Sequence, residues 1–551
     1  MAHTNKLHTF AAFALSLALV AGCSNAGTGG TAGSGGASGD ADAKPAGEAS
    51  GEASAADSLE PITLTFFDQN TGDAFTNPVA QEITKRTGVT IEIQQPTGNP
   101  AEKLNLMLAS DDLPDIILMS RSSDLVNKYI SAGAIVPLDD LIAEHGPNVQ
   151  QMYGDTLNKT RHTDGKNYYL SNWYGLEHEP VFGFNIRKDL LKELAPDKAE
   201  GGVPFAAEEF KQLLTDFKAK YPDIDGKPTI PLTMDGENMG AVTGTFKGMF
   251  GLKPYYEDSE GHIRFDVKDP KYREMVLYMN DLYRSGLIDK DWAINKKQAW
   301  LQKLSSGAVL ATTGAYWDPG DANNILKKDI GEEAQLFPYK VVAPNVDPGQ
   351  TTYGSRSSLG WDAIAISKTN KDPVRTMKFI DFLASEEGQY LLMWGVEGVH
   401  WDMKDGKHTP RPEVLQGFKD DWANYAKQTG IRKWTWFIKN GPGSDGTPYD
   451  LPARYERTPL DQMALKNLSD SVFDTAPYDG LGPKGGTPDA LIEQKVNDIK
   501  TQAVTKAIMA SSAEESNRIF DKMLADMKAA GDEKVEDIID ANFKERETLW
   551  N

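Results

Sequence analysis

The strongest constraint on the fold is an alternation of strand and helix patterns that begins at Ile62. Ile62, Leu64 and Phe66 alternate with threonines, which is the period of two that predicts a half-buried strand. Residues 89–93 and 115–119 predict two more strands, and amphipathic stretches separate the three. Strands and helices in this order predict a parallel sheet with right-handed crossovers, and therefore an α/β lobe.

Two helices between these strands are predicted from their end signals. Asn77 and Pro78 open the first, and Gly88 closes it, because asparagine caps free amide groups, proline suits the first turn and glycine suits the position past the end. Asn99 and Pro100 open the second helix in the same way.

The rest of the chain continues the mixed pattern from about residue 181. Helices are predicted at 208–220, 272–284, 298–304 and 373–383, and strands at 308–312 and 361–366. The C-terminal third is mostly helical. Roughly 490 residues follow the first 58, and that length predicts at least two lobes.

The chain begins with the pattern of a secretory signal over residues 1–22. Lys6 precedes an apolar run at 11–20, which is shorter than the roughly 20 residues a permanent membrane span needs. The signal ends in LVAGC, which resembles the lipobox of bacterial lipoproteins. In that class the cysteine is acylated, so we predict a lipid anchor at Cys23.

Composition narrows the class further. Cys23 is the only cysteine, so the chain has no internal disulfide and no multi-cysteine metal site, and the fold must depend on its apolar core. Residues 24–58 hold no aromatic residue and no aliphatic residue larger than alanine, which predicts a flexible tether. The net charge of −22, without a basic cluster, argues against nucleic-acid binding.

Five motifs carry a family resemblance. They are LPDII at 113–117, FNIRKDL at 184–190, LYRSGLI at 282–288, KFIDFLASEEG at 378–388 and WGVEGVH at 394–400. With them the chain resembles the extracellular solute-binding proteins of carbohydrate ABC importers, in particular the large Gram-positive lipoproteins related to alginate- and pectin-fragment binders. The resemblance covers everything from Leu59 to the end.

The resemblance implies a two-lobe α/β fold of the periplasmic-binding-protein type II, with a hinge, an interlobe cleft and a helical C-terminal third. Lobe 1 is expected at about 59–180 plus part of 365–551, and lobe 2 at about 181–360 plus part of the C-terminal helices. It also implies a monomer on the outer face of the cell membrane that captures an oligosaccharide and delivers it to permease subunits. Ligand binding would select a closed form by a hinge motion.

Sugar recognition needs flat aromatic faces and planar polar groups for vicinal hydroxyls, and the sequence offers both. Trp317 and Trp361 stand beside predicted strand ends and are our first candidates, followed by Trp173 and Tyr174. The other candidates are Tyr316, Asp68, Asn70, Arg121, Arg356 and Asp362. Trp394 is predicted in the core, whereas Trp434 and Trp436 could line an enlarged subsite if their segment is extended.

Three alternatives compete with this interpretation. A peptide-binding or sensory lipoprotein would share the fold, although the supply of tryptophans favours sugar. A glycoside hydrolase would need two carboxylates about 5 to 9 Å apart. With 80 acidic residues in the chain, the sequence does not exclude such a pair. A zinc peptidase or a nucleotide-hydrolysing subunit would need motifs that the sequence lacks.

We therefore predict a binding protein without enzymatic activity, cofactor or metal. The run DIDG at 223–226 resembles the calcium loop of some alginate-binding relatives. Lys227 and Pro228 stand where that loop needs an oxygen ligand and its turn glycine, so no tightly bound calcium is expected.

Overall fold

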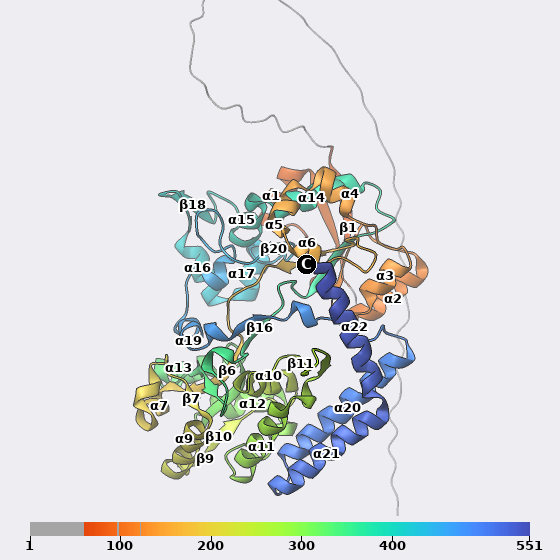
Figure 1. Ribbon diagram of the computed structural model, residues 1–551. Helices are drawn as coiled ribbons and strands as arrows, with labels where there is room; N and C mark the ends of the chain where they lie inside the picture. Colours follow the sequence, from red (N-terminus) through yellow and green to blue (C-terminus); the bar gives the residue numbers. More distant parts are fainter. Residues whose placement is uncertain (1–59, 96–97, 122, 551) are drawn as a thin grey trace, which may run out of the picture. The chain divides into compact units, whose positions relative to one another are not determined.

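Two mixed α/β lobes make up the part of the chain that the computed structural model describes, residues 60–95, 98–121 and 123–550 (Figure 1). Their arrangement confirms the predicted two-lobe α/β fold. The predicted signal peptide, Cys23 and the tether at 24–58 lie outside the described residues. Within the described ranges, no helix has both the length and the apolar character that a membrane span requires.

Lobe 1 is built on a five-stranded sheet of order β2-β1-β3-β17-β4. Its strands are β1 (Ile62–Phe67), β2 (Val89–Gln94), β3 (Ile116–Ser120), β4 (Leu170–Ser171) and β17 (Asp362–Ile366). β1 is parallel to β2 and to β3, as the strand and helix alternation predicts. β17 returns from a distant part of the chain and pairs antiparallel with β3, with Ala363 opposite Met119.

The first helix of lobe 1 follows the predicted end signals closely. The Asn77 side chain accepts a hydrogen bond from the amide of Ala80, Pro78 occupies the first turn, and Gly88 ends the helix at a φ of 67°. The helices of this lobe are α1 (Pro78–Thr87), α2 (Pro100–Ser110), α3 (Leu125–Ser131), α4 (Asp139–His145), α5 (Pro147–Tyr153), α6 (Thr156–Lys159), α14 (Pro373–Ala384), α15 (Glu386–Trp394), α16 (Pro412–Asp420), α17 (Trp422–Thr429) and α18 (Leu451–Arg454).

Lobe 2 is built on a four-stranded sheet of order β10-β13-β6-β14. Its strands are β6 (Phe182–Arg187), β10 (Ile230–Thr233), β13 (Val309–Ala315) and β14 (Leu336–Tyr339). The helices before the C-terminal group are α7 (Lys188–Leu194), α8 (Pro196–Ala199), α9 (Ala207–Lys220), α10 (Met239–Met249), α11 (Pro270–Arg284), α12 (Lys297–Ser305) and α13 (Gly320–Asp329). β13 is buried along its whole length because helices cover both faces of the sheet.

Six two-stranded pairs complete the described fold. They are β5 (Trp173–Tyr174) with β20 (Ile438–Lys439), β7 (Phe205–Ala206) with β15 (Val341–Val342), β8 (Asp223–Ile224) with β9 (Lys227–Pro228), β11 (Tyr255–Glu257) with β12 (Ile263–Phe265), β16 (Gly354–Arg356) with β21 (Val472–Asp474), and β18 (Trp401–Lys404) with β19 (Lys407–Pro410).

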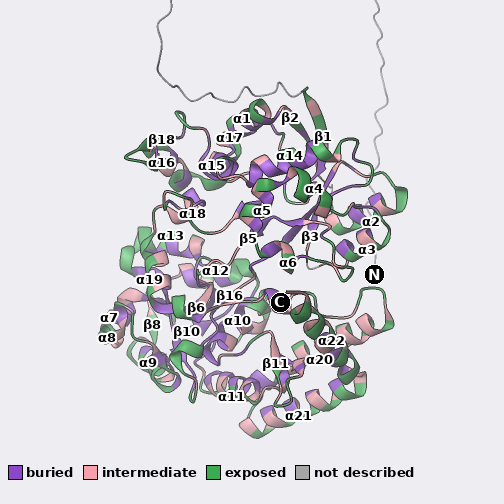
Figure 2. Cartoon of the chain, turned by 45° about the horizontal axis from the view of Figure 1, so that its top comes forward, coloured by how far each residue is buried: buried purple, intermediate pink, exposed green. Residues whose placement is uncertain are grey.

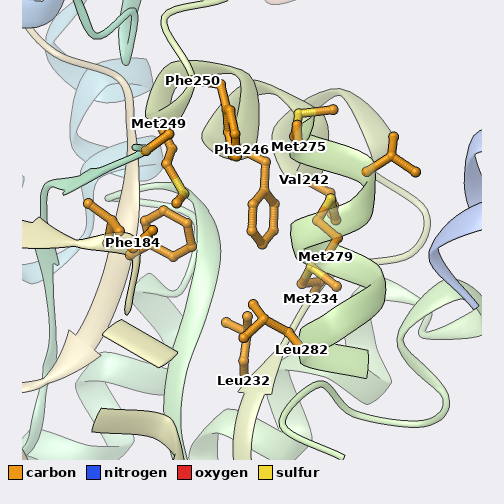
Figure 3. Close-up of a cluster of buried hydrophobic side chains, with 14 of the residues drawn as sticks. Phe184, Leu232, Met234, Val242, Phe246, Met249, Phe250, Met275, Met279 and Leu282 are labelled. Atoms are coloured by element: carbon orange, nitrogen blue, oxygen red, sulfur yellow. The ribbon is translucent and has the colours of Figure 1, made fainter. Parts of the chain in front are cut away.

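Each lobe has its own apolar core. In lobe 2, Phe184 from the sheet packs among Phe246, Met249 and other helical side chains, as Figure 3 shows. In lobe 1, aliphatic side chains of β1, β3 and β17 pack against α14 and α15. The central strands are buried in both sheets, whereas exposed residues gather on the helices (Figure 2). The fold therefore rests on burial of apolar surface, as the lack of disulfides requires.

The C-terminal group consists of α19 (Pro459–Leu468), α20 (Pro488–Ile508), α21 (Ala513–Ala530) and α22 (Asp532–Trp550). Their apolar residues join the core of lobe 2. A buried ion cluster fastens α22: Lys268 Nζ lies 2.9 Å from Asp532 Oδ2 and 2.7 Å from Glu536 Oε2. Glu536 also accepts the amide of Phe265 in β12.

The chain passes between the two lobes at three connections in the described residues. One joins β5 to β6, the second joins β16 to β17, and the third joins α18 to α19. These three connections are called the crossings below.

Candidate functional site

Several predicted site residues meet where the second crossing enters the sheet of lobe 1. The amide of Arg121 donates to the carbonyl of Trp361, which continues the pairing of β3 with β17 beyond the last strand residue. Trp361 is 52% exposed, whereas the next residue, Asp362, is buried. The start of β17 therefore places the exposed ring of Trp361 directly beside the buried carboxylate of Asp362.

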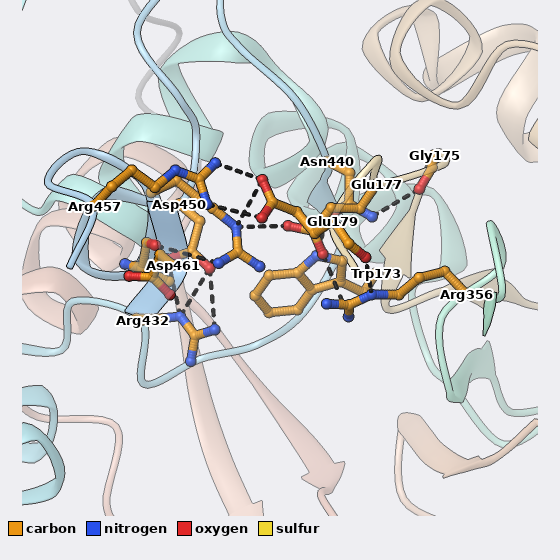
Figure 4. A network of polar contacts seen from close by, with 12 residues as sticks. Trp173, Gly175, Glu177, Glu179, Arg356, Arg432, Asn440, Asp450, Arg457 and Asp461 are labelled. Carbon is orange, nitrogen blue, oxygen red and sulfur yellow. Dashed lines mark hydrogen bonds and ion pairs between the residues drawn. The ribbon is translucent and has the colours of Figure 1, made fainter. Parts of the chain in front are cut away.

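Trp361 stacks on Trp173 from the first crossing. The ring centroids are 5.4 Å apart and the planes are 26° from parallel. Trp173 lies in the short strand β5, where it is buried and its indole N–H donates to Asn440 (Figure 4). Its neighbour Tyr174 is completely buried and stacks on Tyr153, so it offers no exposed face in this structure.

A second open tryptophan belongs to lobe 2. Trp317 follows the end of β13 and is 47% exposed. The Arg356 guanidinium lies 5.7 Å from its ring centroid. Tyr316 is buried, packs edge-on against Trp317, and donates its hydroxyl hydrogen to Asp461. The two exposed tryptophans predicted from sequence therefore belong to different lobes.

A network of ion pairs joins the three crossings (Figure 4). Glu177 in the first crossing lies 3.4 Å from Arg356 in the second and 2.7 Å from Arg454 at the third. Glu179 is paired with Arg457 and lies 3.9 Å from Arg454. Burial alone would raise the pKa of Glu177, but Arg454 and then Arg356 outweigh it, so that pKa is lowered. Glu177 therefore stays ionised at neutral pH.

The buried carboxylates of lobe 1 hold the loop that follows β1. Asp362 accepts hydrogen bonds of 2.7 Å from Gln69 and from Asn70, while Asn172 donates at 3.4 Å. Asp68 accepts the indole N–H of Trp436 at 2.9 Å and is 2% exposed. Of these candidates only Asn70 has an exposed side chain. The buried side chains of Asp68 and Asp362 thus hold this loop in place through hydrogen bonds.

A cavity of about 610 Å³ is lined in part by Leu359, in the segment that precedes Trp361. Residues from both lobes line the cavity. Its lining includes the charged or aromatic side chains of Arg121, Tyr169, Tyr255, Glu493, Arg546 and Trp550. The Arg121 side chain donates to the carbonyl of Gly360 at 2.9 Å, next to Trp361. That contact links the cavity wall to the tryptophan stack.

Two charged side chains that line the cavity, those of Arg546 and Glu493, have shifted pKa values. Arg546 donates to the carbonyl of Pro477 at 2.9 Å, and burial lowers its pKa. Burial also raises the pKa of Glu493. Tyr255 lines the same cavity as these two groups. An arginine donor and a carboxylate acceptor around an aromatic ring are suited to a hydroxylated ligand, because a hydroxyl group both donates and accepts.

Sequence reasoning found Arg121 and Arg356 but missed the other charged residues of the crossings and the cavity. Glu177 and Glu179 follow the candidates Trp173 and Tyr174 within a few residues, and that proximity was the only local signal for them. Arg454 and Arg546 carried no signal, because contacts with Glu177, 277 residues away, and with Ala476, 70 residues away, hold them at the site.

The structure places three further tryptophans, Trp394, Trp434 and Trp436, in the core of lobe 1. Trp394 is completely buried, as predicted. Trp434 and Trp436 are completely buried as well, so the suggestion that they line an enlarged subsite is wrong. Phe75 and Phe66 pack against them, which makes them part of the lobe 1 core.

The described residues do not supply a calcium loop. Residues 223–228 form the β8–β9 hairpin, whose turn holds Asp225 and Gly226 at positive φ angles. Across the described ranges, no group of three or more His, Cys, Asp or Glu side chains could hold a metal ion. The hairpin therefore does not fit the ligand geometry of an EF-hand loop.

Comparison with known proteins places this fold in a family. The model of the bacterial extracellular solute-binding protein family matches residues 79–398, and the chain belongs to that family. Among solved structures, the Streptococcus pneumoniae ABC-transporter substrate-binding protein FusA in complex with kestose is similar at a TM-score of 0.60 and 18% identity. That match covers 88% of this chain and all of FusA.

Two curated relatives from Bacillus subtilis are similar in sequence. The lipoprotein LipO is 25% identical over 60% of this chain and 66% of its own length, slightly under two thirds. The polygalacturonan/rhamnogalacturonan-binding protein YtcQ is 24% identical over 78% of this chain and 83% of its own length.

The buried carboxylate of Asp362, which holds the loop after β1, predicts that the stability of the protein depends on pH. Burial raises the pKa of Asp362 to about 6, against the partly opposing effect of the Asn70 and Gln69 donors. The folded protein thus binds this proton more tightly than the unfolded chain. The contribution to stability is complete below about pH 4 and is lost by about pH 6, an effect on the order of 3 kcal/mol.

Urea unfolding of wild type and Asp362→Asn between pH 4 and pH 7 measures this effect. The free energy of unfolding of the wild type should fall relative to the variant as the pH rises through that window. Asp402→Asn provides the control, because Asp402 is paired with Arg411 on the surface. A constant difference between wild type and Asp362→Asn across the window would contradict the prediction.

Proposed function

We propose that this protein is the substrate-binding subunit of an ABC importer that captures a sugar or oligosaccharide between its two lobes and delivers it to permease subunits. The observation that carries the proposal is the pair of exposed tryptophans, Trp361 in lobe 1 and Trp317 in lobe 2, beside the charged network at the crossings. Flat aromatic faces beside planar charged groups match the chemistry of pyranose rings.

The relatives support a carbohydrate ligand. The name of YtcQ specifies polygalacturonan and rhamnogalacturonan, and FusA was solved with kestose. In the proposal, the aromatic residues Trp317, Trp361 and Trp173, together with Arg356 and Asn70, form one side of the site. The cavity lined by Arg121, Glu493 and Arg546 provides the polar side.

The proposed ligand can be tested with a thermal-shift panel of trigalacturonate, kestose and xylotetraose. A ligand present at 100 times its Kd stabilises a protein by about 2.7 kcal/mol, so one panel member should raise the Tm by several degrees. Chromatography of the incubated sugar should recover it intact, because the proposed function is binding without catalysis. A flat response to all three sugars, or cleavage that copurifies with the protein, would overturn the proposal.

We further propose that the protein is a monomer held on the outer face of the cell membrane by acyl chains on Cys23. Lobe 1 would comprise about 59–180 with part of 365–551, and lobe 2 about 181–360 with part of the C-terminal helices. The relative LipO is a lipoprotein by name, and the sequence LVAGC supports the same anchor here.

Replacing Cys23 by alanine should release the protein from the membrane. Each buried methylene of an acyl chain contributes about 0.8 kcal/mol to membrane binding, so loss of the acylated thiol removes the anchor. Fractionation of cells expressing the full chain should move the protein from the membrane pellet to the soluble fraction. The neighbouring variant Ser24→Ala should stay in the pellet, and persistence of Cys23→Ala there after a high-salt wash would refute the anchor.

A further inference from the structure

Trp361 belongs to a series of four planar groups in contact. Its ring stacks on Trp173, with 5.4 Å between ring centroids and 26° between planes. The guanidinium of Arg432 lies 5.2 Å from the ring centroid of Trp173 and 5.2 Å from that of Trp422. One planar cation therefore contacts two indoles, and Trp361 and Trp422 at the ends of the series are both exposed. These four groups are called the stack below.

Arg432 is held more firmly than a surface arginine. Its Nε and second terminal nitrogen donate to both oxygens of Asp450, at 3.0 to 3.1 Å. Its amide donates to the carbonyl of Leu392 at 2.8 Å. Its backbone has a φ of 56°, a left-handed conformation that residues other than glycine adopt rarely. Such a conformation persists where surrounding contacts determine it, and it often marks a functional position.

The planar guanidinium is suited to this place for two reasons. A guanidinium can stack on the face of an indole, and its fork of N–H donors can bind a carboxylate at two points at the same time. A lysine ammonium can do neither, because it is a compact point charge. The stack therefore depends on arginine at residue 432 and not on positive charge alone.

We propose that Arg432 is the positioning residue of the Trp361 platform. Through Trp173 it fixes the orientation of the exposed Trp361 indole, so that a saccharide ring adds as a fifth layer on a face that is already ordered. A binding surface ordered in advance loses less conformational entropy when the ligand arrives. The inference rests on the proposed function, because it assigns Trp361 to sugar binding.

The test is a double-mutant cycle with Arg432→Lys and Trp361→Ala, measured by calorimetry with whichever of trigalacturonate, kestose and xylotetraose binds the wild type. Arg432→Lys alone should weaken binding by about tenfold. In the Trp361→Ala background the same change should cost less than about twofold, because Arg432 acts through Trp361. Arg411→Lys is the matched control, since Arg411 forms a comparable two-point pair with Asp402 in the same lobe but contacts no indole of the stack.

A second readout does not depend on sugar. In protein labelled with 5-fluorotryptophan, the Trp361 fluorine resonance, assigned with Trp361→Phe, should shift or broaden in Arg432→Lys and stay unchanged in Arg411→Lys. Wild-type affinity in Arg432→Lys, or an undiminished loss in the Trp361→Ala background, would overturn the inference.

Should no panel sugar bind the wild type, the proposed function fails separately. The fluorine resonance then still decides the ordering role: a changed signal supports it, and an unchanged one overturns it.

Discussion

Replacing Trp361 or Trp317 by alanine is expected to weaken oligosaccharide binding by about 30-fold each, because a central aromatic contact typically carries about 2 kcal/mol or more of binding energy. Both side chains are about half exposed, so the free energy of unfolding should change little. Calorimetry with the panel sugar that binds the wild type measures the affinity, and the Tm without ligand measures the stability.

Trp394→Ala provides the contrast for both tryptophans. Trp394 is completely buried and donates its indole N–H to the carbonyl of Tyr449, so its loss should cost about 3–5 kcal/mol of stability. The affinity of the folded Trp394→Ala variant for the sugar should change little. If Trp361→Ala or Trp317→Ala instead behaves like Trp394→Ala, that tryptophan supports the fold and does not bind the ligand.

Replacing Lys268 by methionine is expected to lower the free energy of unfolding by about 3–5 kcal/mol. Lys268 neutralises Asp532 and Glu536, whose side chains are only 1% and 2% exposed. Without the lysine, two buried carboxylates lose the cation that forms an ion pair with both of them. Burial already raises the pKa of Glu536 despite Lys268, so the variant should regain stability as the pH falls and this carboxylate takes up a proton.

Urea unfolding of Lys268→Met at pH 7 and pH 5 checks both parts of this expectation. Lys522→Met is the matched control, because Lys522 pairs with Asp526 on the exposed face of α21 and such pairs contribute less than about 1 kcal/mol. A loss in Lys268→Met no larger than in Lys522→Met would show that α22 does not depend on this ion cluster.

The local pattern of the chain was sufficient for the secondary structure and for the family. α1 begins after Asn77 and ends at Gly88 because capping and the left-handed turn depend on one or two residues at each end. β1 and β2 follow from alternation within six residues. The exposure of Trp317 and Trp361 agrees with their expected positions at strand ends, although their role in binding stays a prediction.

Only the tertiary structure decided which polar and aromatic side chains remain available to a ligand. Asp68 and Tyr174 looked as suitable as Asn70, yet both are buried, because Trp436 and Tyr153 reach them from distant segments. The ion pairs of Glu177 and the contacts of Trp173 with Trp361 and Arg432 likewise join residues more than 170 positions apart. Sequence periodicity reports neighbours within a few residues, whereas burial and pairing depend on which segments the fold brings together.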